Sequence, residues 1–556
     1  MTASSLKKVR IRELMAQQRL EEARVLCERT LAATPGDASV WLLGAVIHGM
    51  LDQPGQTEHY ACEAIRLRPD YAEAHNSLGL ALRLQGRAAE AVPVLQKAVR
   101  LKPDYADAYY NLGVALNGLG RFSEAAESHE RALTLRPRDP EVLNDLGNVL
   151  QALHRHTEAV ERYRRALALK PAYALAHFNL GNALVEIGKT DEAVVHYRRA
   201  VEIDTTFAEA YYNLGEALRI SGRLQEAILH YRAAIRLKPD YVQAHFNLSS
   251  VYLLLGQFKD GWNEYVWQWQ RPTSPRRPFA PTPWNGSDLG GREVFLHAEQ
   301  GLGDELFFLR FVPWLKRRGA GRVAYRPGKK IASLLARVAV IDYVVSAEES
   351  PAAGDMVFSV GDLPRLLGMA HVEEIPPSLT LTPLPAHVES LRQRLADCGP
   401  PPYLGATWRA GTPGKEDLLS KETPLARFAR LLQPLRATVI ALQRAPMSGE
   451  LDQFTAALGR PVYDFSVLND DLEAMLALLA LLDDYVGVSN TNMHLRAGVG
   501  KTARVLVPAP PEWRWMEEGK ESPWFPGFSV YRQGYDGSWE KAFDILSTDL
   551  TQAYDR

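Results

Sequence analysis

The chain has few of the features that mark secreted, membrane or metal-binding proteins. It has only three cysteines in 556 residues, and Cys27, Cys62 and Cys398 are scattered without metal or disulfide spacing. This usage favours a reducing, cytoplasmic setting. No apolar run reaches the length of a membrane span, because the stretch LEAMLALLALLDDYVGV is broken by Asp483 and Asp484. The amino terminus also lacks the apolar core of a secretory signal.

A surplus of one charge is missing as well. Lys and Arg total 64 against 66 Asp and Glu, a formal net charge of −2, so no basic bias indicates a nucleic-acid partner. No acidic cluster suited to Mg²⁺ or Mn²⁺ is evident, and we therefore expect no metal and no bound cofactor. A chain of this length exceeds one hydrophobic core and predicts two or three domains.

What the sequence does have, up to about residue 270, is a repeat of 34 residues. Its markers are Leu-Gly pairs at Leu78-Gly79, Leu112-Gly113, Leu146-Gly147, Leu180-Gly181 and Leu214-Gly215, and prolines at Pro35, Pro69, Pro103, Pro137, Pro171 and Pro239. A 34-residue period with Leu-Gly, then Ala, then Pro is the tetratricopeptide pattern. Residues 1–270 are therefore predicted to form an α-solenoid of stacked helical hairpins.

One polar residue per repeat stands directly before the Leu-Gly pair or its equivalent. These residues are Asn111, Asp145, Asn179, Asn213 and Asn247. Stacked repeats should align them along a groove, where an amide offers a donor and an acceptor to the backbone of an extended peptide. The alternative is that each one caps or bridges its neighbouring helices. The sequence predicts a groove that binds a protein segment.

The second half of the chain has a different pattern. Residues 271–291 are rich in proline, which excludes helix and predicts an extended linker. The tryptophans of GWNEYVWQWQ, just before it, indicate that the last repeat packs against the domain on the far side of this linker. From residue 292 short apolar strands alternate with helices, which predicts parallel sheets. Two such halves, 292–385 and 386–556, predict a cleft where the carboxyl ends of their strands face.

The candidate site residues lie directly after these strands. In the first half, Gly301 and Gly303 allow a tight turn before a helix whose amino terminus attracts anions. Asp304 in that turn is either a helix cap or a general base. In the second half the candidates are Arg409, Lys421, Gln443, Ser489, Asn490, Thr491 and His494. Capping explains each loop alone, but several loops at one sheet edge favour a nucleotide site.

These motifs resemble those of the family 9 glycosyltransferases, the bacterial heptosyltransferases. The matching stretches are GLGDELFFLRFVPWLK, GATWRAG followed by SKETPLARFARLL, VGVSNTNMHLRAGVGKTARVLVP and EWRWMEEGKESPWFPGFSVYRQ. The chain also resembles bacterial proteins that join such a domain to tetratricopeptide repeats. Its layout is similar to the O-GlcNAc transferases, where an asparagine ladder guides polypeptide to the active site. The resemblance implies a GT-B fold of two Rossmann-like domains, with 292–385 on the acceptor side and 386–556 on the nucleotide-sugar side.

The resemblance also implies roles for single residues. Asp304 matches the acid that is taken as the catalytic base, and Lys421 matches a basic residue that contacts the donor phosphates. The loop from Ser489 to His494 matches the donor-binding loop D-T-x-x-x-H, with Ser489 and Asn490 in place of its Asp and Thr. For Trp513 and Trp515, in the WRW block, we expect a structural or donor-side role.

The predicted activity is an inverting, metal-independent transfer of a sugar from a nucleotide sugar to a Ser or Thr hydroxyl of a protein. Some proteins with this layout glycosylate flagellin, so the resemblance implies flagellin as one acceptor. Two alternatives stay open: a non-catalytic repeat scaffold with a degenerate transferase domain, and a transferase that acts on lipopolysaccharide-type glycans. The sequence leaves the sugar, the nucleotide and a homo-oligomer open.

Overall fold

The computed structural model describes residues 3–272, 277–298, 301–328, 330–346, 348–410 and 421–554. It divides into two compact units, Met1–Ala217 and Leu218–Arg556. The proline-rich segment 271–291 belongs to the second unit, and its residues 273–276 lie outside the described residues, as do residues 411–420 of the predicted donor motif. The domain boundaries drawn from the sequence at 270, 291 and 385 stay predictions.

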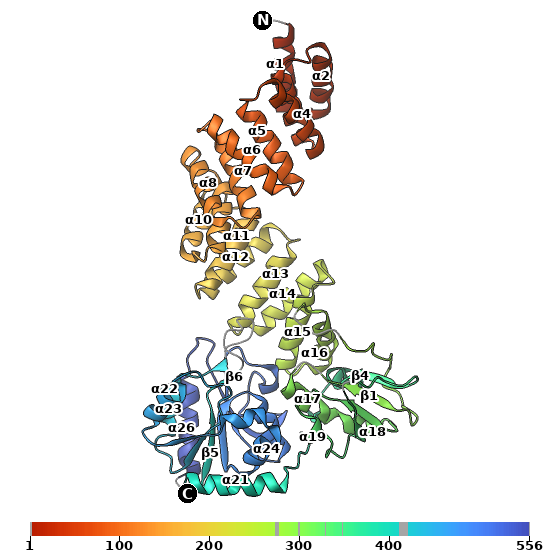
Figure 1. The fold of residues 1–556 in the computed structure, drawn as a ribbon, viewed down its shortest axis with the longest axis vertical. Helices are drawn as coiled ribbons and strands as arrows, with labels where there is room; N and C mark the ends of the chain where they lie inside the picture. The colour runs from red at the N-terminus through yellow and green to blue at the C-terminus, as the bar shows by residue number, and fades with distance from the viewer. Residues whose placement is uncertain are drawn as a thin grey trace. The chain divides into compact units, whose positions relative to one another are not determined.

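The first unit is built of consecutive helical hairpins, which confirms the predicted repeat architecture (Figure 1). Each complete repeat pairs a helix of 13 residues with one of 14. The helices are α1 (Ala3–Ala16), α2 (Leu20–Ala33), α3 (Ala38–Met50), α4 (Pro54–Leu67), α5 (Ala72–Leu84), α6 (Ala88–Leu101), α7 (Ala106–Gly118), α8 (Phe122–Leu135), α9 (Pro140–Ala152), α10 (His156–Leu169), α11 (Ala174–Glu186), α12 (Thr190–Ile203) and α13 (Ala208–Ile220).

The glycine of each Leu-Gly pair marks the point where the two helices of a hairpin touch. A Cβ added at Gly79, Gly113, Gly147 or Gly181 would lie 2.4–2.6 Å from a side chain of the partner helix. Those side chains are Leu95, His129, Tyr163 and Tyr197. The small residues Ala91, Ala125, Ala159 and Ala193 of the partner helices are fully buried. Hairpin packing therefore rests on small residues facing large ones.

His129 fills one of these large-residue positions without a polar partner. Its side chain is fully buried, and neither ring nitrogen has a hydrogen-bond partner in the described part of the chain. At the matching position of the next repeat, the Tyr163 hydroxyl lies 2.7 Å from Asn148 Oδ1 and 2.6 Å from Gln151 Oε1. Burial lowers the pKa of His129 to about 4. The imidazole is therefore neutral in the folded repeat at neutral pH.

The second unit begins at Leu218, in the last turn of α13, and contains the last repeats. Its first helices are α14 (Leu224–Leu237), α15 (Val242–Leu254), α16 (Phe258–Tyr265) and the 3₁₀ helix η1 (Val266–Gln270). Trp262 of α16 is buried, and its ring lies edge-on to Phe308, Trp513 and Trp524 with centroids 5.4–6.1 Å apart. This helix shares one hydrophobic core with the two sheets of the unit. The prediction that the last hairpin packs against them is confirmed.

The first sheet has four parallel strands in the order β3-β2-β1-β4. They are β1 (Val294–His297), β2 (Val323–Arg326), β3 (Tyr343–Val344) and β4 (Met356–Ser359). The proline-rich segment lies along β4, where Thr282 N donates to Val357 O and Val357 N donates to Thr282 Oγ1, both at 2.9 Å. Phe279 of the same segment packs against Phe295 on the face of this sheet.

The helix predicted after the glycine turn is present and buries Leu306, Phe307, Phe311 and Leu315 as expected. It is broken into α17 (Leu302–Phe308), the 3₁₀ helix η2 (Leu309–Phe311) and α18 (Val312–Arg317). Pro313 stands at the start of α18 and has no N–H to continue the hydrogen-bond ladder, which accounts for the break. The remaining short helices of this half are α19 (Ala332–Leu335), η3 (Val360–Asp362), α20 (Leu363–Leu366) and η4 (Val372–Glu374).

The second sheet has the order β12-β13-β11-β10-β5-β8-β9, and only the edge strand β12 is antiparallel. Its strands are β5 (Tyr403–Thr407), β8 (Thr438–Ala441), β9 (Val462–Asp464), β10 (Asp484–Val488), β11 (Arg504–Val507), β12 (Glu521–Ser522) and β13 (Phe525–Arg532). A separate antiparallel pair, β6 (Arg409–Ala410) and β7 (Lys421–Glu422), comes after β5. The sequence did not predict β13, since Pro526 and Gly527 at its start disfavour strand.

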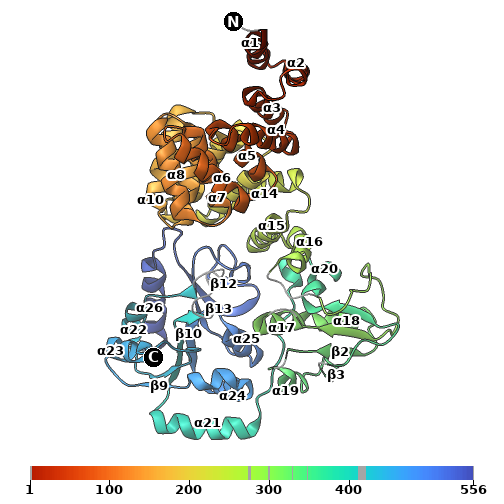
Figure 2. The same cartoon turned by 45° about the horizontal axis from the view of Figure 1, so that its top comes forward.

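Helices cover both faces of the second sheet (Figure 2). Helices α22 (Leu425–Leu432), α23 (Glu450–Leu458) and α26 (Glu540–Tyr554) share one core with Leu404 and Val486, whereas α21 (Pro385–Cys398), α24 (Leu472–Leu481) and α25 (Thr491–Gly498) share the other core with Tyr485. Two 3₁₀ helices complete this half, η5 (Ser466–Asp470) and η6 (Trp513–Trp515). In the described ranges, no helix combines the length and the hydropathy that crossing a membrane requires.

We predict that Gly147→Ala destabilises the first unit by about 1–3 kcal/mol, because the added Cβ overlaps the ring of Tyr163 inside a packed hairpin. Gly118→Ala is the matched control, since Gly118 is also helical but has no heavy atom within 4 Å of the added Cβ. Alanine should leave stability there unchanged or raise it by up to about 1 kcal/mol. Urea unfolding followed by circular dichroism measures both variants, and equal stabilities would contradict the packing role of the glycine.

We also predict that His129 makes the repeats sensitive to acid. Because its folded-state pKa is lowered, the unfolded chain takes up a proton below about pH 6.5 while the folded repeat does not, and stability falls between about pH 6.5 and pH 4. His129→Leu, the residue type found at Leu95, should lose less stability over this range. The control is His59→Leu at an exposed position. The measurement is the urea midpoint at about pH 7.5 and pH 5; the same loss in wild type and His129→Leu would refute the prediction.

Candidate functional site

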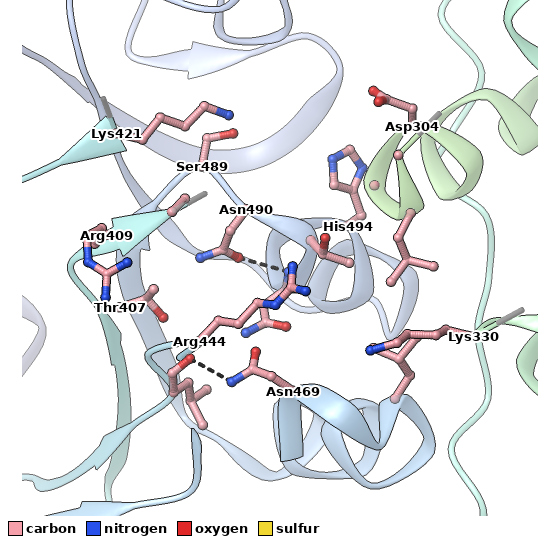
Figure 3. A pocket seen from close by; sticks show the side chains of 18 of the residues that line it. Asp304, Lys330, Thr407, Arg409, Lys421, Arg444, Asn469, Ser489, Asn490 and His494 are labelled. Carbon is pink, nitrogen blue, oxygen red and sulfur yellow. Dashed lines mark hydrogen bonds between the residues drawn. The ribbon is translucent and has the colours of Figure 1, made fainter. Parts of the chain in front are cut away.

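A cavity of ≈ 530 Å³ lies in the second unit at the carboxyl ends of strands from both sheets (Figure 3). Its walls are formed by the segments that follow β1, β2, β5, β8, β9, β10 and β11. The predicted residues that line it are Gly301, Gly303, Asp304, Arg409, Lys421, Ser489, Asn490, Thr491 and His494, whereas Gln443 is not part of the lining. Parallel pairing brings these loops to the same edge of each sheet, and that edge is where ligands bind in open α/β folds.

The segment after β10 forms the amino terminus of α25 at the cavity wall. Asn490 is the N-cap residue, and its Oδ1 accepts a hydrogen bond from the backbone N–H of Asn492 at 2.9 Å. Its side-chain nitrogen donates to the hydroxyl of Tyr485 at 3.1 Å. Thr491 and Asn492 line the cavity, so the positive end of the helix dipole lies beside it. Such a helix start attracts phosphate and other anions.

His494 lies on α25 beside the glycine turn of the other sheet. A Cβ added at Gly303 would lie 3.2 Å from His494 Nε2, so glycine permits this close approach. Burial, and then the charges of Arg514, Arg310 and Lys421, lower the pKa of His494 well below its usual value. The ring is therefore neutral, and its buried Nδ1 has no hydrogen-bond partner among the described residues. A neutral imidazole can give or accept a hydrogen bond at such an atom.

Lys421 and Ser489 contact the same carboxylate. Lys421 forms an ion pair with Glu512 through Oε1, and Ser489 Oγ donates to Glu512 Oε2 at 2.8 Å. The pairing of β6 with β7 places Lys421 opposite Ala410 at this wall. Burial acts to raise the pKa of Glu512, but the charges of Lys421 and Arg514 and these hydrogen bonds outweigh burial and lower it. Glu512 is therefore ionised at neutral pH.

Asp304 stands in the first turn of α17 and forms an ion pair with Arg514, which lies after β11. Its carboxylate makes no capping hydrogen bond to a backbone N–H in the described parts of the chain, so capping does not account for it. The side chain is 35% exposed and lines the cavity. A Cβ added at Gly301 would lie 2.6 Å from Asp304 Oδ2, so the carboxylate lies close against the glycine turn.

Sequence reasoning missed Glu512 and Arg514 because the WRW block drew attention to its tryptophans. Trp515 is buried, and Trp513 packs against Phe307 with centroids 5.2 Å apart. Arg514 between them lines the cavity. Burial opposes its charge, but the carboxylates of Asp304 and Glu512 outweigh burial and raise the pKa of Arg514. The sequence did contain a signal: Arg514 stands between two tryptophans that are expected to be buried. Because a charge is rarely buried unless it is paired, this position indicates a partner carboxylate.

Three further polar residues line the cavity. Lys330 lies after β2, Arg444 lies after β8 and Asn469 lies in η5 after β9. Figure 3 shows Lys330 and Arg444 reaching into the cavity from opposite sides. Lys330 Nζ lies 3.2 Å from the exposed Asp470, and Arg444 has no carboxylate partner among the described residues. The signal in the sequence was their place in the segments that follow strands.

Two of the predicted donor-binding residues hold the loop after β5. Gln443 is 1% exposed; its Oε1 accepts from the backbone N–H groups of Trp408 and Arg409 at 3.2 and 2.9 Å, and its Nε2 donates to Arg409 O at 2.9 Å. The Arg409 guanidinium is paired with Glu450, Nη2 to Oε2 at 3.0 Å. Both residues therefore position the loop, and their direct contact with a donor stays a prediction.

The predicted peptide-binding residues connect neighbouring repeats. Asn111 Nδ2 donates to Asn76 Oδ1 and Asn179 Nδ2 to Asn144 Oδ1, both at 3.0 Å, and Asn213 Nδ2 donates to Asn182 Oδ1 at 2.8 Å. Asp145 accepts from the Tyr110 hydroxyl at 3.0 Å and from Asn144 at 3.2 Å. The bridging alternative thus accounts for these amide nitrogens. Peptide binding by the set, Asn247 included, stays a prediction.

In the described ranges, no three His, Cys, Asp or Glu side chains come together as a metal site. The expectation of metal independence stays a prediction. The described chemistry of the cavity consists instead of basic groups, hydroxyl and amide groups, and two carboxylates. The basic residues of the lining are Lys330, Arg409, Lys421, Arg444 and Arg514, and the carboxylates are Asp304 and Glu512. This lining suits an anion.

Comparison with known families identifies the repeats. A model described as TPR repeat matches residues 79–120, 152–188, 181–219 and 215–256, and one described as tetratricopeptide repeat matches residues 106–139. These matches agree with the 34-residue period and with helices α5 to α15. The chain therefore contains tetratricopeptide repeats.

Among curated proteins, FlbA of Caulobacter vibrioides is 26% identical over 321 residues, which cover 54% of this chain and 53% of FlbA. The chain thus matches about half the length of that relative. Similar solved structures include the Cut9–Hcn1 hetero-tetramer of APC/C (TM-score 0.38, 20% identity, 43% of this chain and 48% of that one). YrrB, a TPR protein with an unusual peptide-binding site, has a TM-score of 0.30 at 26% identity, over 33% of this chain and 95% of that one. These TM-scores are too low to support an inference about function.

We predict that Glu450→Ala destabilises the second unit by about 3 kcal/mol or more, because it leaves the charge of Arg409 buried without its partner. Arg409 and Glu450 are only 4% and 7% exposed. Glu422→Ala is the control, since Glu422 is 56% exposed and 3.9 Å from the same guanidinium; its effect should stay below about 1 kcal/mol. Denaturant unfolding measures both. Equal effects would show that Glu450 does not hold the buried arginine.

Proposed function

We propose that the second unit is a glycosyltransferase of GT-B fold that moves a sugar from a nucleotide sugar to a Ser or Thr hydroxyl of a protein. The observation that carries this proposal is the basic cavity at the carboxyl ends of two parallel sheets. Lys330, Lys421, Arg444 and the start of α25 supply the charge that a diphosphate needs. Leu442 and Leu472 in the same wall offer apolar surface to the rest of a nucleotide.

In the proposed reaction Asp304 accepts the proton of the acceptor hydroxyl while the hydroxyl oxygen attacks the anomeric carbon. The bond from that carbon to the diphosphate oxygen breaks, its electron pair stays with the diphosphate, and the configuration inverts. Lys421, Arg444 and the start of α25 stabilise the charge of the leaving nucleoside diphosphate. Asp304 lies in the helix after β1 of the first sheet, and the start of α25 follows β10 of the second sheet, which suits an acceptor and a donor that meet across the cavity.

The tetratricopeptide repeats are proposed to hold the protein acceptor, and flagellin is the acceptor class that the sequence resemblance favours. Polar residues before the Leu-Gly positions, from Asn111 to Asn247, are the proposed contacts. We place the reaction in the cytoplasm, since Cys27, Cys62 and Cys398 are free thiols and such thiols persist in reducing compartments.

A second candidate is a non-catalytic repeat scaffold. It is favoured by one observation: Asp304 and Lys421, the two residues with the most specific proposed roles, are both engaged in ion pairs within the cavity. In a degenerate transferase domain these pairs would only stabilise the fold. Binding of a nucleotide sugar separates the two candidates.

We predict that one nucleotide sugar in a panel of UDP, GDP, ADP, CMP and dTDP sugars raises the melting temperature and gives heat on calorimetric titration. Lys421→Ala should weaken this binding at least tenfold, because a charge-assisted contact to phosphate is lost. Lys541→Ala, at an exposed position on α26, is the control and should bind as wild type does. If no nucleotide sugar of the panel binds at millimolar concentration, the result would favour the non-catalytic scaffold.

A substitution of Asp304 tests its proposed role as the general base. Asp304→Asn should keep donor binding and lower transfer of labelled sugar to proteins of a cell extract by roughly 100-fold or more, because the general base is lost. Unchanged transfer would exclude Asp304 as the base.

A further inference from the structure

The cavity contains a negative charge of its own. Glu512 projects from the segment after β11 into the wall formed by Lys421 and Ser489. Its side chain is 20% exposed and that of Lys421 is 24% exposed, so both lie at the cavity surface and not in the core.

Both carboxylate oxygens of Glu512 are used by groups of the proposed donor site. Oε1 contacts the Lys421 ammonium, and Oε2 accepts from the Ser489 hydroxyl at 2.8 Å. Ser489 directly precedes Asn490, the N-cap of α25. A cation, a hydroxyl donor and a nearby helix start are the groups that bind a phosphate oxygen. In this structure a carboxylate lies where these groups converge.

Glu450, a buried acid of the same region, behaves differently. Glu450 is 7% exposed and receives hydrogen bonds from the Trp408 indole at 2.7 Å and from the backbone N–H of Met447 at 2.7 Å, in addition to its pair with Arg409. It does not line the cavity. Glu450 is thus held by the fold, whereas the side-chain partners of Glu512 are themselves cavity groups.

We propose that Glu512 is an internal anion that occupies the position of the donor diphosphate and is displaced when the donor binds. This inference rests on the proposed nucleotide-sugar site. The backbone of Glu512 is held by its own hydrogen bond, from Trp515 N to Glu512 O at 2.9 Å, so in the proposed displacement the side chain moves and the backbone stays in place.

The arrangement has a consequence for the affinity of the cavity. An incoming ligand must compete with a carboxylate that is already in place. The ligand loses translational entropy when it binds, whereas the carboxylate, as part of the chain, does not. Chloride or orthophosphate offers little more than the carboxylate does, whereas a diphosphate carries more charge and more acceptor oxygens that also reach Arg444 and Lys330. Glu512 therefore lowers the affinity of the cavity for every anion that must displace it, and a diphosphate, with its additional contacts, keeps the highest affinity.

The test is calorimetric titration of the full chain with inorganic pyrophosphate and with orthophosphate. Glu512→Gln keeps the shape of the side chain and removes its charge, so we expect pyrophosphate to bind about tenfold more tightly than to wild type. Orthophosphate must displace the same carboxylate, so its binding should tighten by a similar factor. Glu518→Gln makes the same charge change at an exposed position nearby and should bind as wild type does.

A second variant keeps the inference testable if Glu512→Gln fails to fold. Glu512→Asp keeps the charge but is one methylene shorter, so its carboxylate cannot contact Lys421 and Ser489 together, and pyrophosphate binding should again tighten. Equal or weaker pyrophosphate binding by both variants, with binding by wild type, overturns the inference and leaves the proposed donor site in place. No binding of pyrophosphate or of any nucleotide sugar by wild type or Glu512→Gln overturns both.

Discussion

The parallel pairing of the strands is the constraint on which the cavity depends. Because β1 and β2 run parallel in one sheet, and β5, β8, β10 and β11 in the other, the loop after each strand emerges at the same edge. Residues more than 200 positions apart, such as Asp304 and Arg514, are thereby brought into contact. An antiparallel arrangement would send every second loop to the opposite edge and leave no common wall.

That convergence concentrates positive charge, and the charge needs compensation. Arg409 is compensated by Glu450, Arg514 by Asp304, and Lys421 by Glu512. Arg444 has no such carboxylate among the described residues, and Lys330 has only the exposed Asp470, where solvent weakens the pair. The uncompensated charge therefore faces the cavity. A neutral ligand would not use it, whereas an anion bound between Lys330 and Arg444 would.

The sequence predicted best where a pattern repeats or alternates. The 34-residue period identified the repeats, and its physical basis is a glycine that faces a large residue across the hairpin, as Gly147 faces Tyr163 and Gly181 faces Tyr197. The loops with Asp304, Lys421 and Asn490 were found because each comes directly after an apolar strand. Glu512 and Lys330 were missed because their importance comes from tertiary partners, which spacing does not show. For the same reason Gln443 was assigned to the donor, although its hydrogen bonds hold the backbone of Trp408 and Arg409.

The last repeat hairpin is part of what supports the cavity. Trp262 of α16 lies edge-on to Trp513, with ring centroids 5.4 Å apart, and the next residue along the chain is Arg514, which pairs with Asp304. Trp513 is fixed from its other side by Phe307, in the helix that carries Asp304. Sheets without α16 would expose this aromatic surface to water and loosen the segment that carries Glu512 and Arg514. The second unit therefore needs α16 to hold the charges of the cavity in place.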